Sequence, residues 1–208
     1  MDTKGASGVA TGILLLSFIL IGATSASVIL GDAGETTYEE NYEEMLEEAL
    51  DEISTYIQIK DVMGKYYTVE EDQHIQKIAI LIKPLFSIDI DASMLMIKLN
   101  NGEQIRMLYY NSNAEFISSN SLFEHPLWDT MTDTDFGFIV ILDTDLSIIE
   151  FDTINDNTDI TYIILKLPPD YEMEKGDSLE ITLFPSTGIT KIINLEAPLP
   201  IKQVVSLN

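Results

Sequence analysis

The sequence predicts an α+β protein, with a long N-terminal hydrophobic α-helix followed by an antiparallel β-sandwich or barrel of immunoglobulin-like type. Two observations support this fold class. No charged residue lies between Gly5 and Gly31, whereas the rest of the chain is strongly acidic. From about residue 59, short apolar runs are separated by turn residues, with no helical period between them. The predicted divisions are a leader at 1–5, a helix at 6–57 and an outer domain at 58–208.

The composition excludes several classes of protein. The 208 residues suffice for one hydrophobic anchor and one domain with a core. Lys and Arg total 11 against 35 Asp and Glu, and the net charge of −24 repels nucleic acid. The chain has no Cys, which excludes a disulfide scaffold and a thiolate site. A hydrophobic content of 46% is too high for a disordered acidic chain, so the charge must cover a folded domain.

The first apolar run, Val9–Leu30, is 22 residues long. A bilayer span needs roughly 20 such residues. Three interpretations are open. In the first, the run is a permanent membrane anchor. In the second, it is a secretory signal removed at the small residues Ala23–Ala26. In the third, it stays on the mature protein after cleavage between Gly5 and Ala6.

Two features favour cleavage before the run. The leader is only five residues long and carries a single Lys, Lys4, directly before Gly5, which is less positive than an ordinary signal. Small residues also recur four apart, which places them on one helix face and lets neighbouring backbones approach closely. These helix-packing residues are Gly8 with Gly12, Gly22 with Ala26, and Ser27 with Gly31.

A second, amphipathic stretch continues the helix. Apolar residues recur at three- and four-residue steps from Tyr38 to Ile57, and eight acidic residues lie between Glu39 and Glu52. Like charges four apart disfavour an isolated helix, so its apolar stripe must pack against something. Gly31–Gly34 predicts a bend. A helix over 6–57 is about 75 Å long at ~1.5 Å per residue, so its second half projects beyond a ~30 Å hydrocarbon layer.

Alternating apolar residues predict the strands of the outer domain. The Asn101-Gly102 pair predicts a two-residue hairpin turn. The segment Asn111–Asp135 is the longest without a pattern, and we expect a surface loop there. The predicted strands are 75–82, 95–99, 105–110, 136–142, 160–167, 179–183, 189–195 and 204–205.

Both ends of the chain resemble the archaeal flagellins, or archaellins, the subunits of the archaeal swimming filament. Lys4-Gly5 followed by Ala6–Gly12 is similar to the short leader of that family and its prepilin-peptidase-type cleavage site. Lys175–Gly188 and the following Ala197-Pro198 are similar to its C-terminal strand, Pro-x-x-Gly turn and Pro ending. Lys83–Asp91 resembles its early strand region. Ser186 departs from the family, whose members often have Glu there.

The resemblance implies a structural protein with no catalytic or cofactor-binding residues. A prepilin-type peptidase would cleave after Gly5, and the precursor would wait in the cell membrane. An assembly motor and its membrane platform would then build an extracellular filament, the archaellum, from copies of this chain alone or mixed with other archaellins. The filament would act in motility, as a propeller turned by a separate motor.

Three alternatives remain open. A type IV pilin-like adhesion filament shares the anchor but binds a surface. A membrane-anchored accessory or stator protein of the archaellum shares both anchor and sandwich. A secreted hydrolase with an ordinary signal would begin near Ser27. The two histidines, His74 and His125, have no patterned partner, and no phosphate-binding loop or metalloprotease helix is present.

The acidic loops predict weak Ca²⁺ binding at most. Ca²⁺ takes six to eight oxygen ligands, which clustered acidic turns could supply. None of the clusters has the central Gly and final Glu of a calcium loop, so solvated turn residues are the favoured interpretation and no metal ligand is assigned. The main cluster is Asp152, Asn155, Asp156, Asn157 and Asp159; two others are Asp129, Asp133 and Asp135, and Asp143 with Asp145.

Overall fold

The computed structural model describes residues 57–69, 72–85, 87, 89–118, 121–185 and 190–207. The predicted leader, cleavage site, long helix, Gly31–Gly34 bend and helix-packing residues lie outside the described residues. Within the described part, no helix is long and apolar enough to cross a bilayer.

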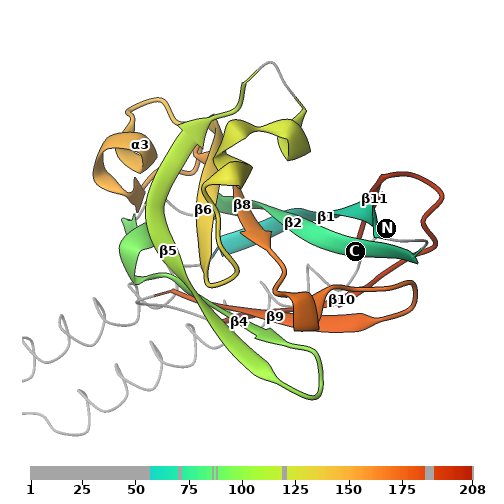
Figure 1. Ribbon diagram of the computed structural model, residues 1–208. Helices are drawn as coiled ribbons and strands as arrows, with labels where there is room; N and C mark the ends of the chain where they lie inside the picture. The colour runs from blue at the N-terminus through green and yellow to red at the C-terminus, as the bar shows by residue number, and fades with distance from the viewer. Residues whose placement is uncertain are drawn as a thin grey trace, which may run out of the picture. The chain divides into compact units, whose positions relative to one another are not determined.

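Nine strands form one sheet in the order β10-β9-β4-β5-β6-β8-β2-β1-β11 (Figure 1). Their bounds are β1 Ile57–Val69, β2 Asp72–Pro84, β4 Met96–Asn100, β5 Ile105–Phe116, β6 Asp135–Leu142, β8 Ile160–Lys166, β9 Ser178–Phe184, β10 Lys191–Glu196 and β11 Val204–Ser206. A two-stranded ladder joins β3 (Ile90–Asp91) to β7 (Thr153–Ile154). The short helices are η1 Ala92–Met94, η2 Leu122–Glu124, η3 Pro126–Asp129, α3 Ser147–Phe151 and η4 Pro169–Tyr171.

The sheet curls into a half-barrel around its own core. β4, β9 and β10 lie across from β1 and β2 (Figure 1). Fully buried residues of distant strands therefore belong to one cluster: Ile80 of β2, Ile97 of β4, Phe138 of β6 and Ile181 of β9. Each of these strands turns alternate side chains to the inner face, and the outer face of β2 and β6 is covered separately by the crossover described below.

The β character predicted for the outer domain is confirmed, but the arrangement differs from the predicted antiparallel sandwich. The nine strands form one continuous sheet, and β5 pairs with β6 in parallel. A parallel pair needs a crossover of a dozen or more residues, which the segment between Phe116 and Asp135 supplies.

That crossover is a second, smaller core, not the plain surface loop predicted for Asn111–Asp135. β5 continues to Phe116, and η2 and η3 then cover the outer face of β2, β6 and β8. The rings of Phe123 and Trp128 stack 5.7 Å apart, and Trp128 Nε1 donates a 2.8 Å hydrogen bond to the carbonyl of Leu122. They pack with Leu127 and Met131 over Ala79, Ile139 and Ile164.

Two local predictions need correction. The Asn101-Gly102 pair does mark a turn, with Gly102 at φ 89°, but the last strand pair is Asn100 with Ile105, so the loop has four residues and not two. Asn101 Oδ1 accepts hydrogen bonds from the backbone N–H groups of Glu103 and Gln104, which stabilises the longer loop. The predicted helix ends at Ile57, whereas the structure has Ile57 as the first residue of β1.

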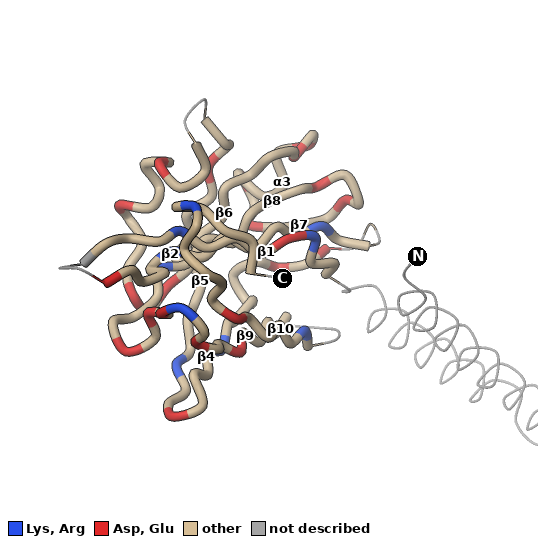
Figure 2. Tube along the Cα trace, turned by 90° about the vertical axis from the view of Figure 1, so that its right-hand side faces the viewer, with Lys and Arg blue, Asp and Glu red and all other residues tan. Residues whose placement is uncertain are grey.

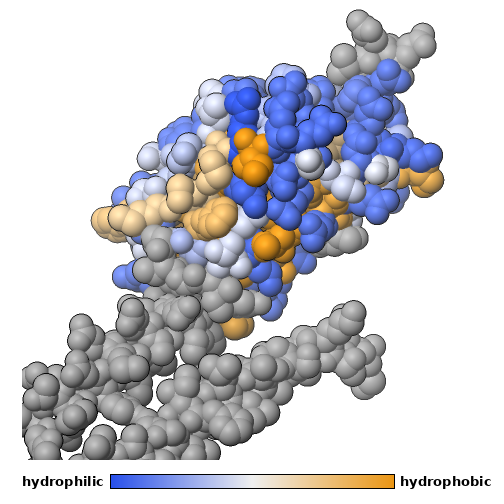
Figure 3. Space-filling model, turned by 90° about the horizontal axis from the view of Figure 1, so that it is seen from below, coloured by the Kyte–Doolittle hydropathy of each residue, from blue (hydrophilic) through white to orange (hydrophobic). Residues whose placement is uncertain are grey.

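The described surface is mostly hydrophilic on the face seen from below, with separate hydrophobic patches (Figure 3). Acidic residues are spread over many elements and greatly outnumber the basic ones (Figure 2). Scattered exposed apolar residues are normal on a soluble surface and need no partner.

We expect Trp128→Ala to lower the free energy of unfolding by about 3–5 kcal/mol, because it leaves a cavity over Ala79 and Ile164. Phe151→Ala is the control, because this ring is 70% exposed and its loss should cost less than about 0.5 kcal/mol. Urea unfolding of the detergent-solubilised full chain measures both. Equal losses would contradict a buried role for the crossover.

Candidate functional site

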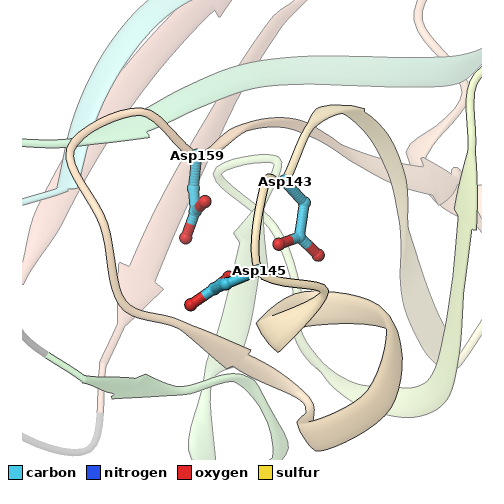
Figure 4. Close-up of side chains that lie close together, drawn as sticks. All are labelled: Asp143, Asp145 and Asp159. Carbon is cyan, nitrogen blue, oxygen red and sulfur yellow. The ribbon is translucent and has the colours of Figure 1, made fainter.

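Three aspartates meet where β6 ends and β8 begins. Asp143 and Asp145 follow β6, and Asp159 directly precedes β8. One carboxylate oxygen of each lies within 4.8 Å of the others, and the three groups surround a common point (Figure 4). Asp143 and Asp159 are buried, whereas Asp145 is exposed. It is the one group of three or more potential ligands found among the described residues.

Asp143 is held by the start of α3. Its carboxylate accepts hydrogen bonds of 3.0 Å from the backbone N–H groups of Ser147 and Ile148. Leu146 lies in the left-handed region at φ 64°, which turns the chain so that these N–H groups face the carboxylate. Such capping satisfies donors that the first helical turn leaves free.

Asp145 is fixed by Asn155. Its Oδ2 accepts a 2.9 Å hydrogen bond from Asn155 Nδ2, and its Oδ1 accepts a 3.2 Å bond from the backbone of Ser147. The hydrogen bond from Asn155 is the largest cause that lowers the pKa of Asp145 to about 2. Asn155 Oδ1 also accepts from Ser147 Oγ, so one amide ties the turn before β8 to α3.

Asp159 carries an unsatisfied oxygen. Its Oδ2 accepts hydrogen bonds from the backbone N–H groups of Asn155 (3.0 Å) and Asp156 (3.1 Å). Its Oδ1 is buried and has no hydrogen-bond partner among the described residues. Burial raises the pKa of Asp159. An unpaired buried carboxylate oxygen beside two other carboxylates is costly, and a bound cation would offset that cost.

The structure regroups the acidic residues that the sequence suggested. Asp159 joins Asp143 and Asp145, which belonged to a different predicted cluster. Asp152 instead accepts a 2.6 Å hydrogen bond from the Tyr110 hydroxyl. Asp156 caps its own turn by accepting from the N–H of Thr158. Asn157 is exposed on the same turn.

The predicted cluster of Asp129, Asp133 and Asp135 is not part of this group, and its members make other contacts. Asp135 accepts hydrogen bonds from the backbone and hydroxyl of Thr132. Asp133 lies 3.8 Å from Arg106, and Asp129 is exposed at the end of η3. The pairing of Leu142 with Ile160 brings the carboxylates of the candidate site together, and no local sequence motif predicts that pairing.

The two histidines have structural surroundings. His125 is buried; its Nε2 lies 3.1 Å from the carbonyl of Phe116, and its Nδ1 accepts from the N–H of Leu127. Because a carbonyl can only accept, this pattern fits a neutral ring with the proton on Nε2. His74 Nδ1 lies 3.8 Å from Glu174 at the surface. Both contacts explain these residues without catalysis.

Comparison with known proteins gives the family. The model of the archaeal-type flagellin family matches residues 5–195. Flagellin B4 of Pyrococcus abyssi is 31% identical over 150 residues, which cover 69% of this chain and 68% of the relative. The matches span about two thirds of the length of the curated relatives.

Two solved structures share the fold. The crystal structure of the flagellin FlaB1 of Methanocaldococcus jannaschii aligns with a TM-score of 0.64 at 19% identity, covering 73% of this chain and 95% of FlaB1. A chain of the archaeal flagellum of Methanospirillum hungatei aligns with a TM-score of 0.54 at 10% identity, covering 97% of this chain and 99% of its own. Because the family model matches residues 5–195, the chain belongs to the archaeal-type flagellin family, the structural, non-enzymatic subunits of the archaeal swimming filament.

Proposed function

We propose that this archaellin is made as a membrane precursor, cleaved after Gly5 by a prepilin-type peptidase, and polymerised through residues 6–57 into the extracellular swimming filament. The observation that carries this proposal is the family match, which begins at Gly5 and ends at residue 195. In this function residues 6–56 form the long helix, and the half-barrel β domain that begins at Ile57 is the outer domain. The assembly motor and its membrane platform are the further partners.

Small residues supply the preference for the filament over the membrane. Moving Val9–Leu30 from lipid into a bundle of identical helices removes no further apolar surface from water. Close backbone approach must therefore favour the bundle, through van der Waals contact at Gly8, Gly12, Gly22 and Ala26. Each copy meets the next through two different surfaces, which generates an open helical polymer.

The first experiment on this proposal identifies the N-terminal residue of the protein in sheared filaments. We expect Ala6, because cleavage after Gly5 leaves the apolar segment on the mature chain. Gly5→Val should block cleavage, since the bulkier side chain obstructs the peptidase, and should leave full-length precursor in the membrane without filaments. Mass spectrometry reads both outcomes. Filament protein that begins near Ser27 would refute the proposal.

A second variant separates helix packing from processing. Gly12→Leu adds bulk to the small-residue face, so we expect a cleaved, membrane-inserted subunit whose filament yield falls at least about tenfold. Ala10→Leu is the control, because residue 10 lies two positions from Gly8 and Gly12 and points to another helix face. Electron microscopy of cells expressing each variant counts the filaments. An equal loss in both variants would argue against a specific packing face.

We further propose that Asp143, Asp145 and Asp159 bind a divalent cation such as Ca²⁺. The specific observation in favour is the buried, unpartnered Oδ1 of Asp159 beside two carboxylates. Bound there, the ion would join the end of β6, the start of α3 and the start of β8. It would stabilise the outer domain without taking part in any reaction.

We expect Ca²⁺ at about 100 times its dissociation constant to stabilise the full chain by about 2.7 kcal/mol. Asp159→Asn should abolish this gain, yet raise the melting temperature in chelator because it removes a buried charge. Asp129→Asn, an exposed change of the same kind, should alter neither. Titration calorimetry and thermal unfolding measure these effects. No heat and no thermal shift with Ca²⁺ would dismiss the site.

A further inference from the structure

Three lysines stand side by side on the outer face of the sheet. Lys65 of β1 pairs with Lys77 of β2, and Lys77 pairs with Lys166 of β8. Directly opposed residues of neighbouring strands point to the same face, and like charges in that position destabilise a sheet. The chain has only 11 Lys and Arg residues against 35 acids, so this lysine row is a local reversal of its charge.

The row is only partly neutralised within the domain. Lys65 is buried and forms an ion pair with Glu124 of η2. Lys77 Nζ lies 5.0 Å from the ring centroid of Trp128 and 5.4 Å from that of Tyr67. These rings hold the ammonium group in place but leave its charge.

Lys166 ends the row, and among the described residues it has no ion pair or hydrogen bond. Lys77 and Lys166 are half-buried, so an approaching anion can still reach them. Three cations with one carboxylate leave an excess of positive charge on a strongly acidic protein.

The densest negative charge in the chain lies between Glu39 and Glu52, with eight acids in 14 residues. In the proposed filament, where the apolar stripe of this segment packs against other helices, its acidic residues are the ones left to meet a neighbouring outer domain. Among self-repelling copies, opposite charges placed on different surfaces favour one register of association over others.

Chain length favours a neighbouring copy as the source of these acids. Lys65 lies eight residues along β1 from Ile57, about 26 Å at ~3.3 Å per residue. Glu52 is five residues before Ile57, and an extended chain of that length spans at most ~18 Å. Glu52 of the same chain therefore cannot reach Lys65. The acids farther from Ile57 reach it only if the chain reverses its direction before β1. A second copy has no such restriction.

We propose that Lys77 and Lys166 of one subunit, supported by Lys65, bind the acidic segment Glu39–Glu52 of a neighbouring copy in the filament. This inference rests on the proposed polymerisation and names one interface within it. The contact is electrostatic, so it weakens as salt is raised.

Two full-length variants test the contact in a strain with no other filament subunit. The first, K77E with K166E, reverses the row; the second, E44K with E48K, reverses part of the segment. Each alone should lower the filament yield at least about tenfold, because like charges then meet at the contact. Expressed together they should restore filaments, since each variant offers the other an opposite charge. K175E with K202E, at two exposed lysines, is the matched control and should assemble normally.

The inference would be overturned if co-expression gave no higher filament yield than either variant alone. Normal filaments from the K77E, K166E chain would also overturn it. Because Lys77 contacts Trp128, the double variant could unfold, and K166E alone is then the second test. Normal filaments from the K166E chain would overturn the inference. A lower filament yield that co-expression with the E44K, E48K chain restores would support it. Filaments of the unmodified chain that begin at Ala6 confirm polymerisation separately. Their absence would refute the proposed function, whereas their presence with any overturning result refutes only this contact.

Discussion

The parallel pairing of β5 with β6 is the constraint on which the rest of the domain depends. Antiparallel neighbours need only a tight turn, but a parallel pair needs a long crossover. The segment between Phe116 and Asp135 supplies it, and its route over the outer face puts Trp128 on Ala79 and Ile164. The same pairing places β6 between β5 and β8. The carboxylates of Asp143 and Asp145, after β6, therefore lie beside Asp159, which directly precedes β8.

Charge is organised by the same part of the sheet. A net charge of −24 keeps separate chains apart, so any attractive contact requires a local exception. The lysine row is such an exception on the outer face, where the crossover contributes Glu124 and Trp128 as its partners. The three aspartates are the opposite case, because they concentrate negative charge at one end of β6 and β8. Each arrangement brings together residues distant in sequence.

Much of the fold could be predicted from the sequence, and the failures have physical causes. Apolar runs identified β6 and β8, because strands covered on both faces read as continuous hydrophobic sequence. β1 was not delimited, since Lys60, Asp61 and Lys65 interrupt its apolar pattern. The acidic residues of the candidate site were each noticed, but they were grouped by proximity in sequence. Asp159 joins Asp143 only through strand pairing, and pairing between distant strands leaves no local signal.

A filament subunit of this family meets two requirements that oppose each other. Under the proposed function it must remain a stable monomer in the membrane before assembly, and it must then prefer other copies of itself. A large apolar interface on the outer domain would satisfy the second and defeat the first, because it would associate too early. The described domain instead buries most of its large apolar residues in two cores of its own, and Phe138 and Trp128 are covered there without a second chain. In the proposed filament, preference for the polymer then depends on helix packing and on charge contacts that are individually weak and repeat along every turn.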